Sequence, residues 1–345
     1  MARDAAAPDA SSNLDNRVRA HSVVVTLLIL TVGFTLVGQL SDRLAASSSP
    51  SANASPPGGS AGGTPSAPGL SPTPQPTPVD HRPQFIYAAG DIADCPDTVP
   101  AVPDLVRIRR ALILAVGDIV YPSGAARGFK ECFDPLWGDL KARIRPVPGN
   151  HDYKSGVATG YYDYFGAAAG DVGRGWYSFD MGTWHIIAIN SMCQFIGGCR
   201  AGSPQLEWLA ADLAAHPAAC TLAFWHHPRF SSGNGASPQR TEALWQALYA
   251  AGAEVVLNGH DHDYERFTPM DPTGQVDLQR GIREFVVGTG GANLTRRVRV
   301  AAHSEIWTRT HHGLLEMTLR AGRYDWRFIA AETRKVVDAG SGTCH

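Results

Sequence analysis

The chain has 345 residues, with an apolar fraction of 44% and a charged fraction of 18%, which suits one large or two modest globular domains. Its 30 Lys and Arg residues are balanced by 32 Asp and Glu residues, so the formal net charge is −2. This balance excludes the basic surface that is typical of nucleic-acid-binding proteins, and we expect no nucleic-acid partner.

The N-terminal segment is predicted to lead the protein into a membrane. Residues 23–40 carry no charged side chain, and a helix of this length spans about 27 Å, close to the bilayer core of about 30 Å. Arg17 and Arg19 precede it, which favours a cytoplasmic tail over residues 1–21. We expect a transmembrane signal anchor at 22–40, and the alternative is a signal peptide cleaved near Ala45 and Ala46. An uncleaved anchor would make the membrane a partner, and either reading makes the rest extracytoplasmic.

Residues 41–83 are predicted to be a disordered linker. From Ser47 to Pro83 the chain consists mainly of Ser, Pro, Gly and Ala, with almost no large apolar side chain. Such a segment cannot offset the entropy cost of ordering by burying apolar surface, and its proline-rich end is expected to be extended. The remaining residues, 84–345, are assigned to one folded domain.

Disulfide bonds are expected in this domain. All six cysteines follow the N-terminal segment: Cys95, Cys132, Cys193, Cys199, Cys220 and Cys344. An even number on the exported side indicates disulfides more than buried free thiols. Cys193 and Cys199 flank a Gly-Gly pair and are candidates for a small closed loop. Pairs Cys95–Cys132 and Cys220–Cys344 would complete one possible set, although the sequence allows many connectivities.

The domain shows an α/β pattern. Short apolar runs, typical of strands buried on both faces, are predicted at 85–91, 111–118, 143–152, 184–190, 220–228, 253–262 and 283–291. Helices are expected to begin at Ser203 and Ser237, each followed by proline at the first helical position. The tail 311–330 is predicted to be a hairpin that turns at Ala321 and Gly322.

Metal-ligand side chains stand at the carboxyl end of nearly every predicted strand. Because ligands bind at this edge in open α/β sheets, we expect these clusters to converge. They are Asp91, Asp118 with Tyr121, Asn150 with His151, His226, and His260 with His262. Each cluster alone has a plain structural reading, such as a turn or a packed histidine. All of them together, each after an apolar run, favour a metal site.

These motifs resemble those of a known family. GDIAD (90–94), GDIVY (117–121), GNHD (149–152), FWHHP (224–228) and GHDHDYER (259–266) are similar to the five motif blocks of purple acid phosphatases, within the calcineurin-like metallophosphoesterases. The resemblance implies a two-sheet β-sandwich flanked by helices, the four-layer metallophosphoesterase fold, with a dinuclear metal centre.

The resemblance also implies the ligands. The first metal would bind Asp91, Asp118, Tyr121 and His262, and the second would bind Asp118, Asn150, His226 and His260. Asp118 would bridge the two ions. His226 rather than His227 matches the family ligand, because it stands two residues before a proline. We expect His227 to pack or to donate a hydrogen bond behind the ligands.

The ligand types suggest which ions bind. Other metallophosphoesterases often carry a histidine two positions after the first aspartate, where this chain has Ala93. Tyr121 can replace that ligand, and a phenolate oxygen suits a trivalent ion such as Fe(III). Two histidines, an amide oxygen and a shared carboxylate suit a divalent ion at the second position, namely Zn, Mn or Fe(II).

The expected activity is hydrolysis of small phosphate monoesters by a metal-bound hydroxide, with His151 assisting the leaving group. One alternative is a phosphodiesterase or nucleotide hydrolase with the same centre. Another is a surface binding module with a degenerate site. The loop 288–294 (GTGGANL) is a candidate to bind phosphate through its amides, although a glycine-rich turn is the simpler interpretation. His311 and His312 are expected at the surface or behind the ligands, without a metal of their own.

Overall fold

The fold was analysed in a computed structural model that describes residues 80–95, 97 and 99–345. The predicted cytoplasmic tail, the membrane or signal segment and nearly all of the linker lie outside these residues, so they stay predictions. Among the residues that are described, no helix combines the length and the apolar character needed to cross a bilayer.

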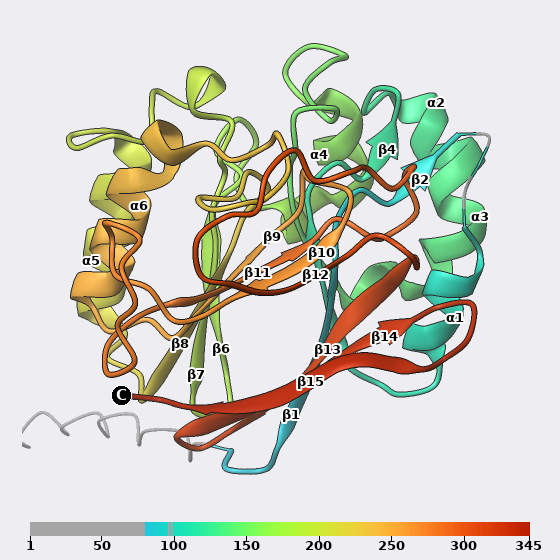
Figure 1. The fold of residues 1–345 in the computed structure, drawn as a ribbon. Helices are drawn as coiled ribbons and strands as arrows, with labels where there is room; N and C mark the ends of the chain where they lie inside the picture. Colours follow the sequence, from blue (N-terminus) through green and yellow to red (C-terminus); the bar gives the residue numbers. More distant parts are fainter. Residues whose placement is uncertain (1–79, 96, 98) are drawn as a thin grey trace, which may run out of the picture. The chain divides into compact units, whose positions relative to one another are not determined.

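Two large sheets form the centre of the domain (Figure 1). The six-stranded sheet has the order β15 (Val336–Thr343), β14 (Arg323–Ala330), β13 (Gly313–Arg320), β1 (Gln84–Ala89), β3 (Leu112–Val116), β5 (Ile144–Val147). The seven-stranded sheet has the order β12 (Ser304–Thr308), β10 (Tyr264–Phe267), β11 (Arg283–Val287), β9 (Val255–Asn258), β8 (Cys220–Phe224), β7 (Trp184–Ala188), β6 (Tyr177–Met181). A small parallel pair joins β2 (Ala93–Asp94) to β4 (Val120–Tyr121).

Helices cover the outer face of each sheet, so the domain has four layers (Figure 1). Beside the six-stranded sheet lie α1 (Ala101–Arg107), α2 (Ala126–Gly128), η1 (Phe129–Phe133), α3 (Asp134–Trp137), η2 (Gly138–Arg143), α4 (Thr159–Phe165) and η3 (Gly166–Ala169). Beside the seven-stranded sheet lie η4 (Cys193–Phe195), α5 (Pro204–Ala215) and α6 (Pro238–Ala250). This arrangement confirms the predicted two-sheet sandwich.

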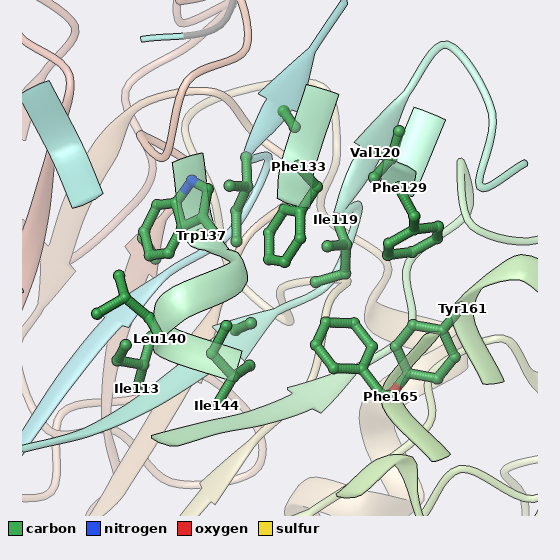
Figure 2. Close-up of a cluster of buried hydrophobic side chains, with 14 of the residues drawn as sticks. Ile113, Ile119, Val120, Phe129, Phe133, Trp137, Leu140, Ile144, Tyr161 and Phe165 are labelled. Atoms are coloured by element: carbon green, nitrogen blue, oxygen red, sulfur yellow. The ribbon is translucent and has the colours of Figure 1, made fainter. Parts of the chain in front are cut away.

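Three apolar cores hold these layers together. The central core packs one sheet on the other and includes Ile86 and Leu114 from the first and Leu222 and Phe285 from the second. A second core lies between α5, α6 and their sheet. The third lies under the opposite helices, where Phe129, Phe133, Trp137 and Phe165 gather (Figure 2). Each buried aromatic side chain contributes roughly 1.5–3 kcal/mol, which offsets the ordering of these short helices.

The elements predicted from the sequence form in the structure, and several further elements were not predicted. Every predicted strand and the hairpin of β13 and β14 form, and Ser203 caps α5 by accepting a hydrogen bond from the Leu206 amide at 3.4 Å. Helix α6 also begins after Ser237 as predicted, but the Ser237 hydroxyl donates to the Gly235 carbonyl at 3.2 Å, and only its backbone carbonyl accepts from the amides of Arg240 and Thr241. Strands β6, β10, β12 and β15 were not predicted; β15 was missed because its exposed, glycine-containing sequence lacks an apolar pattern.

All six cysteines are paired, in the set named from the sequence. The bonds join Cys95 to Cys132, Cys193 to Cys199 and Cys220 to Cys344. The first ties the turn after β2 to η1, and the third ties β8 to the C-terminal end of the chain. The disulfide prediction is confirmed.

Candidate metal centre

The predicted ligands meet at one edge of the two sheets. Strands β1, β3 and β5 are parallel to one another, as are β7, β8, β9 and β11. Asp91 follows β1, Asp118 follows β3, Asn150 follows β5, His226 follows β8 and His260 follows β9. All of these residues therefore lie at the carboxyl ends of the parallel strands, at the same end of both sheets.

Three of these residues have a backbone conformation that side chains rarely adopt. The φ angles of Asp91, Asp118 and His260 are 58°, 50° and 73°. A left-handed conformation is unfavourable for residues other than glycine and concentrates at functional sites. Here it turns the chain sharply at the end of each strand, so that the side chain faces the centre instead of continuing along the sheet.

Glycines next to these residues allow the loops to approach. A Cβ atom at Gly117 would lie 2.5 Å from Nδ1 of His226, and its φ of 90° also requires glycine. A Cβ atom at Gly149 would collide with the Asp118 carboxylate. The Gly-Asp and Gly-Asn pairs of the motifs thus have a steric cause.

Tyr121 joins the ligands predicted for the first metal. Its hydroxyl lies 2.6 Å from Oδ1 of Asp91, 3.0 Å from Oδ2 of Asp118 and 3.0 Å from Nε2 of His262. Nε2 of His262 is also 3.3 Å from Oδ1 of Asp91. The other ring nitrogen, Nδ1, faces the Asn293 carbonyl at 2.9 Å. This contact fixes the ring with Nε2 toward the carboxylates.

The ligands predicted for the second metal form an adjoining group. Nε2 of His226 lies 3.3 Å from Oδ2 of Asp118, 3.1 Å from Oδ1 of Asn150 and 3.2 Å from Nδ1 of His260. Donor atoms of Asp118, His226 and His260 all lie within 4.8 Å of one another. Nδ1 of His226 donates to the Val116 carbonyl at 3.0 Å, which leaves Nε2 facing the group. Asp118 belongs to both groups, as expected of a bridging carboxylate.

The buried carboxylates of this centre need positive charge beside them. Asp91 and Asp118 are completely or almost completely buried, at 0% and 1% exposure. Burial lowers the pKa of His226 and His262, yet the charges of these carboxylates outweigh it and raise both pKa values to about 9. Protons on imidazoles thus balance the buried negative charge. A metal ion in place of those protons would use the same atoms as ligands.

Tyr121 adds a constraint on the kind of ion. Burial, followed by the charges of Asp91 and Asp118, holds the pKa of its hydroxyl well above the usual range. A tyrosinate could form here only beside a strong positive charge, which a trivalent ion would supply. The donor set of three anionic oxygens, one amide oxygen and three imidazoles fits two ions of unequal charge.

His227 lies behind the ligands. Its Nδ1 is 2.9 Å from the Ser191 hydroxyl and its Nε2 is 3.2 Å from the Arg240 guanidinium. The ring packs against that of His260, with centroids 4.3 Å apart. Of the two adjacent histidines, His226 therefore faces the carboxylates and His227 supports a neighbouring ring.

His151 borders the centre from the loop after β5. Its amide donates to Oδ1 of Asp118 at 2.6 Å, and its Nε2 lies 4.0 Å from Oδ2 of the same carboxylate. The ring lies against that of Tyr121, with centroids 4.1 Å apart. Nδ1 faces the Pro122 carbonyl at 2.8 Å. The side chain thus borders the carboxylates without joining the ligand groups.

Sequence reasoning missed several residues that hold these loops. Asp152, whose pKa rises to about 8 through burial and the charge of Asp118, accepts hydrogen bonds from the amides of Gly149 at 2.9 Å and Ile119 at 3.2 Å. Asp261, between the two histidines of GHDH, accepts from the amides of Asn234 and Gly235 at 3.1 and 3.0 Å. Their place inside the motifs was the available signal, but a carboxylate there could equally have been a ligand.

The loop 288–294 is a structural turn. The amides of Gly288, Gly290 and Ala292 donate to the carbonyls of Asp263, Gly90 and Asp91 at 3.1, 2.9 and 2.9 Å. These three amides are therefore not free to bind phosphate, which favours the glycine-rich turn. Nε2 of His312 lies 3.1 Å from the Ala292 carbonyl, which places this histidine behind the same turn.

A two-sheet sandwich with convergent metal ligands at its strand ends is the architecture of a metallophosphoesterase. The chain belongs to the calcineurin-like phosphoesterase family, whose model matches residues 80–264. In structure it is similar to a purple acid phosphatase from yellow lupin seeds, with a TM-score of 0.62 and 17% identity over 78% of this chain and 55% of that one. At this identity the likeness concerns the fold.

Curated relatives include purple acid phosphatases. Purple acid phosphatase 15 of Arabidopsis thaliana is 25% identical over 251 residues, covering 61% of this chain and 45% of that protein. Acid phosphatase type 7 of Homo sapiens is 28% identical over 216 residues, covering 52% and 47%. The chain therefore spans about half the length of the curated relatives it matches.

Proposed function

We propose that this protein is a phosphatase that hydrolyses phosphate monoesters at a dinuclear metal centre. The observation that carries the proposal is the convergence of the Tyr121 hydroxyl with two buried carboxylates and His262 within 3.0 Å. A turn or a packed histidine pair needs no such group. The similarity to purple acid phosphatases, in motifs and in fold, supports the same conclusion.

The proposed ligands are those predicted from the motifs. Asp91, Tyr121 and His262 would hold Fe(III), while Asn150, His226 and His260 would hold a divalent ion, Zn, Mn or Fe(II), with Asp118 shared. When bound, the ions would neutralise phosphoryl oxygens and lower the pKa of a water molecule. Three anionic ligands against a trivalent and a divalent ion leave a positive centre, which attracts a phosphate anion.

The remaining steps fall to the chain's own residues. His151 is proposed to stand at the leaving-group side, because Nδ1 faces the Pro122 carbonyl while Nε2 lies 4.0 Å from Asp118 without joining the ligand groups. The amide of His151 fixes one oxygen of Asp118, so that the other is free for the ions. The glycines of the loops keep the ligands close, because a side chain at Gly117 or Gly149 would collide with His226 or Asp118.

Action outside the cytoplasm is part of the proposal. Three disulfides, one of them linking residues 124 positions apart, suit an oxidising compartment. The uncharged segment 23–40 would export the domain as a signal anchor or as a cleaved signal.

The test is a visible spectrum and a metal analysis of the full chain, purified from an oxidising compartment, beside Tyr121→Phe. A broad visible band that Tyr121→Phe abolishes would establish tyrosinate bound to Fe(III). Turnover of phenyl phosphate well above that of bis-phenyl phosphate would establish the monoesterase. A chain that holds no metal would overturn the proposal and favour a binding module, and faster diester turnover would favour the diesterase.

A further inference from the structure

A cavity outside the metal centre is lined by two arginines. Its volume is about 390 Å³, and it lies between the loop that follows β8, the start of α6 and the loops 270–275 and 299–303. None of the proposed metal ligands, all of which the structure describes, lines it. Its lining combines three basic side chains with apolar ones, namely Arg229, Arg299 and His303 with Phe230, Met270 and Val300.

Arg229 contributes a buried positive charge to this cavity. The residue is only 7% exposed. Its Nη1 donates to the Pro238 carbonyl at 3.0 Å, and its Nη2 donates to the Pro272 carbonyl. Each of these nitrogens carries two hydrogens, so each keeps one hydrogen beyond these bonds. The backbone oxygens thus hold the guanidinium in place and leave it with hydrogens to donate.

No carboxylate forms a salt bridge with Arg229 in the described part of the chain. The carboxyl group of Glu284 accepts from the backbone amides of Arg229 and Phe230 at 2.8 and 3.0 Å, and Asp271 accepts from amides of its own loop. Burial lowers the pKa of Arg229, and the charges of Glu242, Glu284 and Asp271 offset this only in part. A buried cation without a paired anion is unfavourable, and a bound anion would relieve that cost.

Arg299 brings a second guanidinium to the same cavity. Its Nη2 donates to the Ser231 carbonyl at 3.1 Å, and its backbone amide donates to the Ser232 carbonyl at 3.1 Å. The residue is exposed and forms no salt bridge with a described carboxylate. Arginine presents a planar fork of donors that matches the oxygens of a phosphate or sulfate group. Two such forks at one cavity therefore favour an oxyanion as its ligand.

We propose that this cavity binds a phosphate or sulfate group, either as the free ion or as the head of a small organic molecule. The two guanidinium groups would hold the oxygens, and the remaining volume would accept water or an organic body beside Phe230 and Met270. The site is separate from the metal centre. The two are linked through Ser231, whose carbonyl accepts from Arg299 and whose hydroxyl donates to Asp261.

Calorimetric titration of the full-length, metal-loaded chain with orthophosphate tests the proposal. The parent is expected to bind orthophosphate at two sites, one at the metals and one in the cavity. Asp118→Asn should lose the site at the metals and keep the other. Arg299→Gln should weaken the cavity site about 10-fold and keep the site at the metals. Its kcat/KM for phenyl phosphate should stay within about 2-fold of the parental value.

Two further variants separate the fork from the charge. Arg229→Lys keeps the buried charge but removes the fork, so it should also weaken the cavity site about 10-fold. If this variant does not fold, the exposed Arg299 carries the test alone, and thermal unfolding shows which case holds. Arg296→Gln is the matched control, because Arg296 is exposed on the same loop but does not line the cavity, and it should bind as the parent does.

Phenylphosphonate, which has no ester bond to hydrolyse, distinguishes the two sources of the ligand. Tighter binding of phenylphosphonate than of orthophosphate to Asp118→Asn would indicate an organic molecule, and weaker binding would indicate the free ion.

A parent with a single orthophosphate site that Asp118→Asn abolishes would overturn the proposal. Undiminished binding in Arg299→Gln would overturn it too, as would an equal loss in Arg296→Gln, because that loss would reflect net charge alone. Failure of the parent to hydrolyse phenyl phosphate would instead refute the proposed function. It would leave this test intact, since titration of Asp118→Asn measures the cavity site without turnover.

Discussion

Two clusters of histidine and aspartate lie in the described part of this domain, and they differ in where their ring nitrogens are directed. One is the candidate metal centre at the carboxyl ends of the strands. The other joins Asp180, His185, Asp212 and His216. His185 is the second residue of β7, whereas His226 follows the last residue of the parallel strand β8. The two clusters therefore lie at opposite ends of the strands of one sheet.

In the second cluster, both ring nitrogens of His185 are already hydrogen-bonded to carboxylates. Nδ1 of His185 lies 2.7 Å from Asp180 and its Nε2 lies 2.9 Å from Asp212, so one imidazolium uses both hydrogens on two carboxylates. The ring of His216 stacks on that of His185 at 4.8 Å and 10°, and a single ion could not lie in both ring planes. In the candidate centre, by contrast, His226 and His262 each direct Nδ1 to a backbone carbonyl and turn Nε2 toward the buried carboxylates. The two clusters share residue types and differ in geometry: only in the candidate centre do the rings keep one nitrogen each aimed at a common point, as a shared ion requires.

Asp118→Asn breaks the candidate centre with the largest expected effect. The shared carboxylate would lose one anionic oxygen, and both ions would bind more weakly. We expect loss of most bound metal and a fall in kcat/KM of about 1,000-fold, or about 4 kcal/mol. Metal analysis and phenyl phosphate kinetics measure both. Asp212→Asn is the counterpart in the second cluster and should keep the parental metal content; loss of metal there would contradict the comparison.

His185→Gln should break the second cluster without touching activity. His185 is 1% exposed, and its removal would leave the buried Asp212 carboxylate without the imidazole that faces its Oδ2. The free energy of unfolding is expected to fall by about 3 kcal/mol. Burial lowers the pKa of His185, but hydrogen bonds to Asp212 and Asp180 outweigh it and raise the pKa above the usual value. The contribution is thus complete below about pH 6.5 and is lost as pH rises through the folded-state pKa. Denaturant unfolding at several pH values checks this, and a pH-independent difference between parent and variant would contradict it.

Glu284→Gln tests a buried carboxyl group that lies outside the candidate metal centre and has no imidazole beside it. Burial raises the pKa of Glu284 from 4.5 to about 8, although the amides of Arg229 and Phe230 donate to it. Because the folded state holds a proton that the unfolded state releases, stability should fall by about 1.4 kcal/mol per pH unit as pH rises between these values. Glu284→Gln should flatten this slope in thermal unfolding. Glu242→Gln, on the exposed face of α6, is the control and should leave the slope intact.

His227→Gln has the smallest expected effect and tests the choice between adjacent histidines. His227 contacts Ser191 and Arg240 and only packs against His260. We expect unchanged metal content and a decrease in kcat/KM of less than about 3-fold, or about 0.6 kcal/mol. In His226→Gln the divalent ion should be lost. The reverse pattern of metal loss would exchange the two assignments.

Much of this site was predictable because parallel strands place the residues that follow them at the same end of the sheet. Apolar runs identified the strands, and the residue after each run lies at the same sheet edge as its neighbours. Asp91, Asp118 and His260 were found in this way. The sequence also distinguished His226 from His227 through the spacing to Pro228.

Residues that hold the loops of the motifs were not predictable. Asp152 was missed because an aspartate directly after His151 could equally have been a ligand, and only the folded loop brings its carboxylate to the amides of Gly149 and Ile119. The same holds for Asp261, whose partners Asn234 and Gly235 lie on a different loop. Strand β15 was missed because its pairing with β14 supplies order that its own pattern lacks.

The sequence by itself determined the class of fold, which ligand residue follows which strand, and the bounds of the segment rich in Ser, Pro and Gly. These follow from periodicity and residue chemistry, which are local properties of the chain. Tertiary structure decided which ring nitrogen of His226 and His262 faces inward and which loop amides are already occupied. Those depend on contacts between segments far apart in the chain, such as His262 with Asn293 and His226 with Val116. Packing between the two sheets sets these contacts, and no single segment encodes them.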